Sequence, residues 1–120
     1  MECLFCNIID KKIPAYIIYE DLDTIVFLDI KPDYNGHLLV VPKKHFSTID
    51  DIDETAFKQL LLVIKKMKIK LEERLNIDGL TVVNNNGLYQ EIKHFHFHLK
   101  PAYKQSQPLI PLEEIYNILK

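Results

Sequence analysis

The stretch HFHFHLKP, His94 to Pro101, alternates histidine with large apolar residues. Successive side chains of an extended strand point to opposite faces, so His94, His96 and His98 share one face and the apolar residues share the other. The apolar face is expected to pack on a core. The histidines could be only the solvent side of a half-buried strand, where other polar residues would serve as well. However, three of the chain's five histidines stand within five residues, which makes that interpretation unattractive.

A single zinc ion bound by all three histidines is excluded on a regular strand. The outer two are separated by roughly 13 Å at about 3.3 Å per residue, whereas a zinc–nitrogen bond is only about 2 Å long. Two neighbouring histidines could chelate a metal, but the third must then do something else. The histidines of this strand therefore divide their labour.

The composition bounds the classes of function. A chain of 120 residues predicts one domain over residues 1–120, large enough to bury a core. A net charge of −2 gives no general attraction to nucleic acid or to an anionic membrane surface. No apolar run reaches the ~18 residues needed to span a bilayer, and the N-terminal MECLFCNIIDKK does not look like a secretory signal. Since no such signal is recognised, we expect a cytoplasmic protein with reduced thiols. The two cysteines, Cys3 and Cys6, are too few for a disulfide framework.

The order of the predicted elements indicates an α+β domain with an antiparallel five-stranded sheet. Strands are predicted over residues 16–19, 24–28, 37–42, 80–84 and 94–101. One long helix is predicted within residues 48–76, and a short helix that carries Leu112, Ile115, Tyr116 and Leu119 closes the chain. The apolar stripe of the long helix consists of Phe57, Leu60, Leu61, Ile64, Met67, Leu71 and Leu75. Asp51 with Glu54 resembles a capping box at its start, and its basic residues indicate a solvated face rather than a nucleic-acid site.

Cys3 and Cys6 form a CxxC pair for which three interpretations stay open at this point. They could be a redox pair, although such a motif usually belongs to a βαβ unit. They could be two small buried hydrophobic residues. They could also hold a structural zinc, for which His45 and one strand histidine are available as the further ligands.

Five blocks of the sequence, taken in order, resemble one family. CLFCNIIDKKIPA, YEDLDTIVFLDIKP, GHLLVVPKKH, NNG and QEIKHFHFHLKP cover nearly the whole chain. In these blocks the chain is similar to the histidine triad (HIT) superfamily of nucleotide hydrolases and transferases. The resemblance implies a two-step reaction in which His96 attacks an α-phosphorus and water then hydrolyses the nucleotidyl-histidine. His98 and His37 would contact the phosphate oxygens and the leaving group.

The resemblance also implies a nucleotide pocket. Asp29 would bind the ribose hydroxyls, and an apolar pocket around a purine base would consist of Leu4, Phe5, Ile8, Phe27 and Ile30. Asn85 would place an amide beside the phosphate, and Gln90 and Glu91 stand just before the triad. The implied substrates are AMP phosphoramidates or dinucleoside polyphosphates. A homodimer that joins two sheets edge to edge is implied as well.

A structural zinc ion is implied by the same resemblance. Its ligands would be Cys3, Cys6, His45 and His94. The first triad histidine would then hold a metal, the second would attack and the third would hold phosphate. No metal is required for the chemistry itself.

The sequence departs from the family pattern in two places. The loop before Gln90 is about two residues shorter than usual and lacks the glycine that normally precedes this glutamine. Lys100 stands where an apolar residue is expected. If the strand reaches it, Lys100 adds a cation to the histidine face. We hypothesise that this cation favours longer polyphosphates; the alternative is that Lys100 is simply a solvated strand end. Two further classes of function stay open: a nucleotide-binding or scaffold protein with little catalysis, and a purely structural zinc module.

Overall fold

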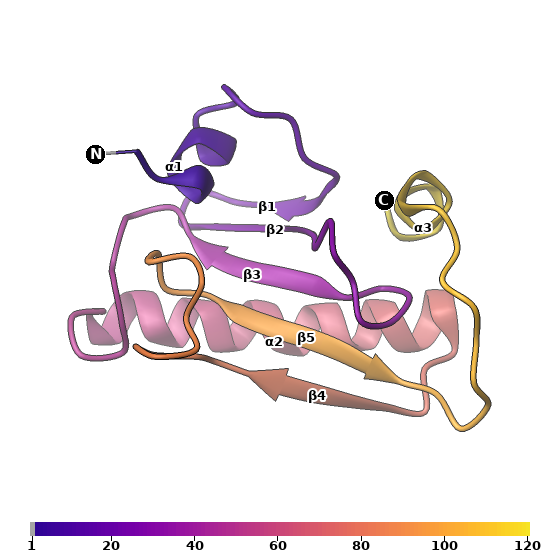
Figure 1. The fold of residues 1–120 in the computed structure, drawn as a ribbon. Helices are drawn as coiled ribbons and strands as arrows, with labels where there is room; N and C mark the ends of the chain where they lie inside the picture. Colours follow the sequence, from indigo (N-terminus) through magenta and orange to yellow (C-terminus); the bar gives the residue numbers. More distant parts are fainter. Residues whose placement is uncertain (1) are drawn as a thin grey trace.

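The computed structural model describes residues 2–120 (Figure 1). Over these residues the chain forms three helices and one antiparallel sheet of five strands in the order β1-β2-β3-β5-β4. The strands are β1 (Ile17–Glu20), β2 (Thr24–Leu28), β3 (Leu38–Pro42), β4 (Gly79–Val83) and β5 (Phe97–Ala102). The helices are α1 (Leu4–Ile9), α2 (Glu54–Leu75) and α3 (Leu112–Leu119). The predicted α+β fold class is therefore confirmed.

The main core lies between the sheet and α2, which runs along one face of the sheet in Figure 1. Phe95, Phe97 and Leu99 all belong to this core, together with Leu60 and Leu71 of α2. The apolar residues of the triad segment thus face α2, as the alternating pattern predicts. The histidines between them must point to the opposite side of the sheet.

A second, smaller core covers that opposite side. Phe5 and Ile8 of α1 pack there against Phe27 of β2 and Leu39 of β3. Every residue of β2 and β3 is buried, because α2 and α1 cover the two faces of these central strands. Helix α1 therefore lies on the histidine side of the sheet.

Strand β5 begins at Phe97 rather than at His94, so the predicted start is three residues too early. The segment before it satisfies its backbone groups outside the sheet: Phe95 N–H donates to the Phe46 carbonyl at 2.7 Å, and the Asn84 side chain donates to the His96 carbonyl at 2.8 Å. The side chains nevertheless keep alternating between the two faces across this boundary.

Two helix predictions need correction. The capping residue of α2 is Asp53, whose carboxylate accepts from the Ala56 N–H at 2.7 Å, whereas Asp51 accepts from the loop N–H groups before the helix. Leu61 is 42% exposed, and Val63 takes a place in the core instead. The short helix α1 was not predicted.

Strand β4 lies at an edge of the sheet, and its Val82 is 45% exposed. An edge strand carries unpaired backbone groups that a second chain can pair with. The edge-to-edge dimer stays a prediction. Among the helices of residues 2–120, none is both long enough and apolar enough to cross a membrane.

Candidate functional site

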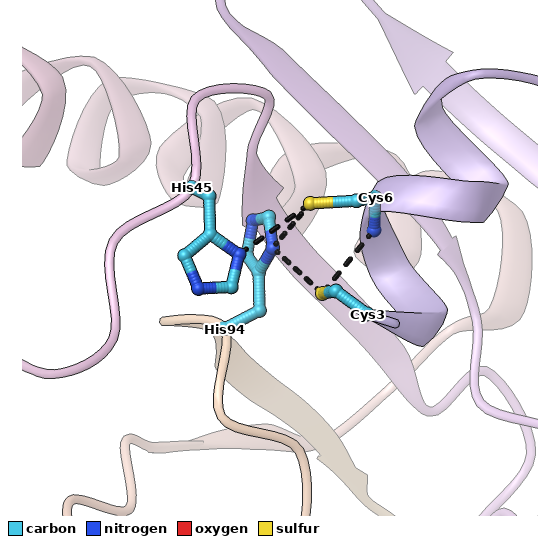
Figure 2. A group of neighbouring side chains, drawn as sticks. All are labelled: Cys3, Cys6, His45 and His94. Atoms are coloured by element: carbon cyan, nitrogen blue, oxygen red, sulfur yellow. Dashed lines mark hydrogen bonds between the residues drawn. The ribbon is translucent and has the colours of Figure 1, made fainter. Parts of the chain in front are cut away.

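Four side chains distant in sequence converge beside α1, and Figure 2 shows them pointing toward one another. The His94 Nδ1 atom lies 3.4 Å from the Sγ of Cys3 and 3.6 Å from the Sγ of Cys6. The Nδ1 atom of His45 lies 3.4 Å from the Sγ of Cys6. These are the four residues predicted as metal ligands.

The spacing of these atoms fits a tetrahedral zinc ion. Bonds of about 2.3 Å to sulfur and 2.05 Å to nitrogen place sulfur and nitrogen about 3.5 Å apart at the tetrahedral angle. The His94 Nε2 atom lies 2.8 Å from the Pro42 carbonyl, which can only accept, so Nε2 carries the proton. The Nδ1 lone pair of His94 is therefore free to face the two thiols.

The protonation states of the ligands also match this reading. Burial lowers the pKa of His94 to about 4, which keeps the imidazole neutral. Burial and the adjacent Cys3 raise the pKa of the Cys6 thiol to about 11. A divalent cation would reverse this preference of Cys6, because it favours the thiolate form of its ligands.

The unprotonated ring nitrogen of His96 is Nε2, whereas that of His94 is Nδ1. The His96 Nδ1 atom lies 2.7 Å from the His94 carbonyl, so Nδ1 is the protonated nitrogen and the lone pair lies on Nε2. The Phe5 ring packs edge-on against the His96 ring, with centroids 5.0 Å apart. Burial lowers the pKa of His96, with the neighbouring His98 acting in the same direction. A neutral imidazole in this tautomer can act as a nucleophile through Nε2.

His37 and His98 form a directed hydrogen-bonded pair. The Asp33 N–H donates to His37 Nδ1 at 3.1 Å, so the proton of neutral His37 is on Nε2. His37 Nε2 lies 3.0 Å from His98 Nδ1 and donates to it, which leaves an N–H on the Nε2 of His98. Burial is the main cause that lowers the pKa of both imidazoles. The pair therefore ends in a fixed donor beside His96.

Asp29 lies beside this pair, with its Oδ2 atom 3.5 Å from His37 Nε2 and 3.8 Å from His98 Nδ1. Two histidines and a carboxylate at such distances could hold a metal. Coordination through His37 Nε2 would, however, move the proton to Nδ1, directly opposite the Asp33 N–H. The hydrogen-bonded pair fits these contacts better than a metal does.

Only three of the five residues predicted to surround the base are buried together. Phe5, Ile8 and Phe27 are buried together, and the Phe5 and Phe27 rings pack edge-on with centroids 5.4 Å apart. Leu4 and Ile30 are 41% and 71% exposed. These two residues lie outside the core.

The three polar residues predicted before the triad, Asn85, Gln90 and Glu91, lie in different environments. Asn85 is half-buried, but the amide that reaches the triad segment belongs to Asn84, through its bond to the His96 carbonyl. Gln90 is 3% exposed. Its side-chain amide donates to the Ser47 carbonyl and accepts from the Gly87 N–H. Glu91 is exposed. The turn-forming run NNNG did not reveal which of its amides faces the triad.

Lys100 follows His98 on the same side of β5 and forms an ion pair with Asp33, at 3.0 Å between Nζ and Oδ2. The Lys100 charge acts on both His37 and His98. The strand therefore extends the histidine face to Lys100, as the alternation predicts. Asp33 contacts both Lys100, through its carboxylate, and His37, through its main chain.

Comparison with known proteins is consistent across sequence and structure. Residues 10–105 match the HIT domain family. A HIT-like protein of Methanocaldococcus jannaschii is 39% identical over 97% of this chain and 91% of its own length. An adenosine 5′-monophosphoramidase of Saccharomyces cerevisiae is 34% identical over 90% of this chain and 67% of the yeast protein. The crystal structure of a zinc-bound histidine triad family protein from Mycobacterium smegmatis superposes with a TM-score of 0.91 at 32% identity, over 99% of this chain and 91% of that one.

Proposed function

The chain belongs to the HIT family, and from this premise we propose that it hydrolyses nucleoside 5′-phosphoryl compounds at the α-phosphorus through a nucleotidyl-histidine. The substrate classes are AMP phosphoramidates and dinucleoside polyphosphates. The similarity to the yeast phosphoramidase supports the first class. The observation that carries the proposal is the tautomer of His96, whose Nε2 lone pair is left free by the bond of Nδ1 to the His94 carbonyl.

In the first step, His96 Nε2 attacks the α-phosphorus and the bond from phosphorus to the leaving group breaks. The Nε2–H of His98 donates a hydrogen bond to the bridging atom or to a phosphate oxygen, where negative charge develops, and the leaving nitrogen of a phosphoramidate takes up a proton from solvent. His37 holds His98 in the required tautomer through the bond of 3.0 Å between their rings. In the second step, water attacks the same phosphorus, the N–P bond breaks, and the nucleoside monophosphate is released with a proton.

The nucleoside would lie along the histidine side of the sheet. Asp29 is the proposed acceptor for the ribose hydroxyls, and Phe5, Ile8 and Phe27 form the floor of the proposed base pocket with Leu4 and Ile30 at its rim. The amide of Asn84, with Asn85 next to it, would keep the His96 main chain in place. Gln90 supports the loop from within, and exposed Glu91 would face the solvent side of the cleft.

We include a structural zinc ion in the proposal. Cys3, Cys6, His45 and His94 would hold it, and it would supply a rigid link between α1 and the triad segment. The similarity to a zinc-bound HIT protein and the sulfur–nitrogen distances of 3.4–3.6 Å support this assignment. His94 would then position His96 through the carbonyl that fixes its tautomer.

The test is to trap the covalent intermediate. Wild-type protein mixed with an AMP phosphoramidate or a dinucleoside polyphosphate and quenched rapidly should yield a peptide that carries a nucleoside monophosphate on His96. His96→Ala should lose the adduct and more than about a thousandfold in kcat while it still binds AMP. His98→Ala is the matched control, because it removes a neighbouring imidazole but leaves the attacking one, and it should still form the adduct.

Two results would contradict the proposal. Near-normal turnover by folded His96→Ala would show that this ring is not the nucleophile. Binding of AMP by the wild type with neither an adduct nor turnover would favour the nucleotide-binding or scaffold class instead.

A further inference from the structure

We propose that Lys100 forms an anion subsite next to His98 that binds the phosphate beyond the scissile bond, so that the protein selects nucleotides whose leaving group is itself a nucleoside polyphosphate. This inference rests on the proposed function and specifies its substrate class. Lys100 is the residue that occupies an apolar position of the family pattern.

The order of groups along the triad segment gives the subsite its direction. His96, His98 and Lys100 point to one side, and consecutive members are roughly 6.6 Å apart along an extended chain. The attacking nitrogen is on His96, and the donor to the bridging atom is on His98. A leaving group that continues in the same direction reaches Lys100 next.

The Lys100 ammonium is held at this end of the site without being buried. Its partner is the Asp33 carboxylate at 3.0 Å, and the two side chains are 28% and 56% exposed. Ion pairs this exposed contribute little to stability. A phosphate group with a larger negative charge can therefore displace the carboxylate at small cost and take over the ammonium.

The neighbouring backbone keeps Lys100 close to the reacting groups. Asp33 N–H fixes the tautomer of His37, which in turn donates to His98. Thr81 of the edge strand β4 pairs with Lys100 in the sheet register, which fixes the Cα position of the lysine. The ammonium is thus attached to a rigid strand rather than to a loop.

The two substrate classes differ in what their leaving groups require. When a dinucleoside polyphosphate reacts, the P–O bond breaks and the leaving nucleoside polyphosphate departs as an anion that needs no proton. When a phosphoramidate reacts, the P–N bond breaks and the leaving nitrogen must gain a proton. A fixed cation stabilises the first leaving group and gives no help to the second.

The experiment compares kcat/KM for diadenosine tetraphosphate with kcat/KM for adenosine 5′-phosphoramidate in three variants. Lys100→Met should lower kcat/KM for diadenosine tetraphosphate, relative to kcat/KM for adenosine 5′-phosphoramidate, by about tenfold or more. This is the effect expected from the loss of one charge-assisted hydrogen bond. Asp33→Asn keeps the backbone N–H and removes the competing carboxylate, so it should raise the ratio of these two values severalfold. Lys68→Met is the matched control: it removes a lysine that is also paired with a carboxylate, Glu72 at 2.7 Å, but on α2.

A binding measurement makes the inference independent of turnover. By calorimetry, Lys100→Met should reduce the preference of the protein for ATP over AMP, and Lys68→Met should leave it unchanged. An unchanged substrate ratio or an unchanged ATP preference in Lys100→Met would overturn the anion subsite while the adduct on His96 still stands. Failure of the wild type to hydrolyse either substrate would instead count against the proposed function, because the ATP preference still tests Lys100.

Discussion

At the scale of single residues, the main chain decides what each histidine can do. The Pro42 carbonyl takes the proton of His94 at Nε2, whereas the His94 carbonyl takes the proton of His96 at Nδ1. The Asp33 N–H imposes the opposite arrangement on His37. Identical side chains thus present a lone pair toward the two cysteines, a lone pair on the opposite ring nitrogen, and a hydrogen-bond donor. The sequence indicates that the roles differ, and these backbone contacts fix which ring nitrogen carries the proton.

The hydrogen-bonded pair of His37 and His98 predicts a loss of stability in acid. Burial lowers the pKa of both imidazoles below the ordinary value of 6.5, although Asp29 and Asp33 act in the opposite direction. Between 6.5 and the lower folded-state values, the unfolded chain binds more protons than the folded chain, so stability is fully present above pH 6.5 and falls as the pH drops. NMR titration of the two rings should give midpoints below 6.5.

A variant isolates this contribution from the other buried histidines. His37→Gln cannot take up the proton, so its free energy of unfolding should change less between neutral and acidic pH than that of the wild type. The charges that face the pair, including Lys100, are unchanged in this variant. Equal pH dependence in both proteins, or ring midpoints above 6.5, would contradict the prediction.

At the scale of elements, the turn before β3 packs Gly36, the residue before His37, against the end of α2. Gly36 has a φ of +87°, and a Cβ atom there would lie 2.6 Å from Leu75 Cδ1 and 3.2 Å from Leu71 Cδ2. The left-handed backbone alone costs a residue other than glycine about 1–2 kcal/mol. The close packing of this turn on α2 therefore depends on glycine.

Substitution at this turn should destabilise the protein. We expect Gly36→Ala to lower the free energy of unfolding by about 1–3 kcal/mol, because it combines backbone strain with the contact to α2. Gly87→Ala is the matched control, since Gly87 has the same φ of +87° but nothing within 4 Å of an added Cβ. Denaturant unfolding of both variants measures the difference, which reports the contact alone. A loss that is no greater at Gly36 than at Gly87 would show that Leu75 moves aside freely.

Most elements could be predicted from the sequence, and the failures have physical causes. The pattern gave β2 its observed bounds, and α2 follows from its apolar period. Helix α1 has only six residues, and its N-terminus is capped by the Cys3 sulfur, which accepts from the Cys6 N–H at 3.4 Å. Cysteine gives no recognised capping signal. Asp51 and Asp53 both fit a helix start, and only the loop contacts of Asp51 separate them.

The candidate site shows the same limit. Alternation along the triad predicts which side chains share a face, and the four residues named by the resemblance are brought close enough together to hold a metal. Periodicity cannot show which amide of the asparagine run reaches the His96 carbonyl, nor that the Gln90 amide is spent on the protein itself. Those contacts depend on a loop whose length differs from the family pattern, so they do not follow from the sequence.

At the scale of the whole molecule, the proposed zinc site joins three parts of the chain that are far apart in the sequence. Cys3 and Cys6 lie at the start of the chain, His45 lies in the loop after β3, and His94 lies just before β5. Helix α1 is otherwise held by the small core around Phe5. That same ring packs against His96 at 5.0 Å between centroids. Loss of the link should therefore affect both the attachment of α1 and the nucleophile.

Metal removal tests this coupling. We expect purified protein to contain about one zinc ion per chain. Chelation should lower the melting temperature. Where the free zinc concentration exceeded its Kd a thousandfold, the loss corresponds to about 4 kcal/mol in the free energy of unfolding. The double variant with Cys3→Ser and Cys6→Ser should already have the lower melting temperature and should not respond to the chelator. This control separates the effect of metal removal from other effects of the chelator. Because the His94 carbonyl orients His96 at 2.7 Å, the chelated wild type should also form the His96 adduct more slowly. A chelated protein with unchanged melting temperature and unchanged adduct rate would contradict the link, since α1 and the triad segment would then hold their positions without a metal.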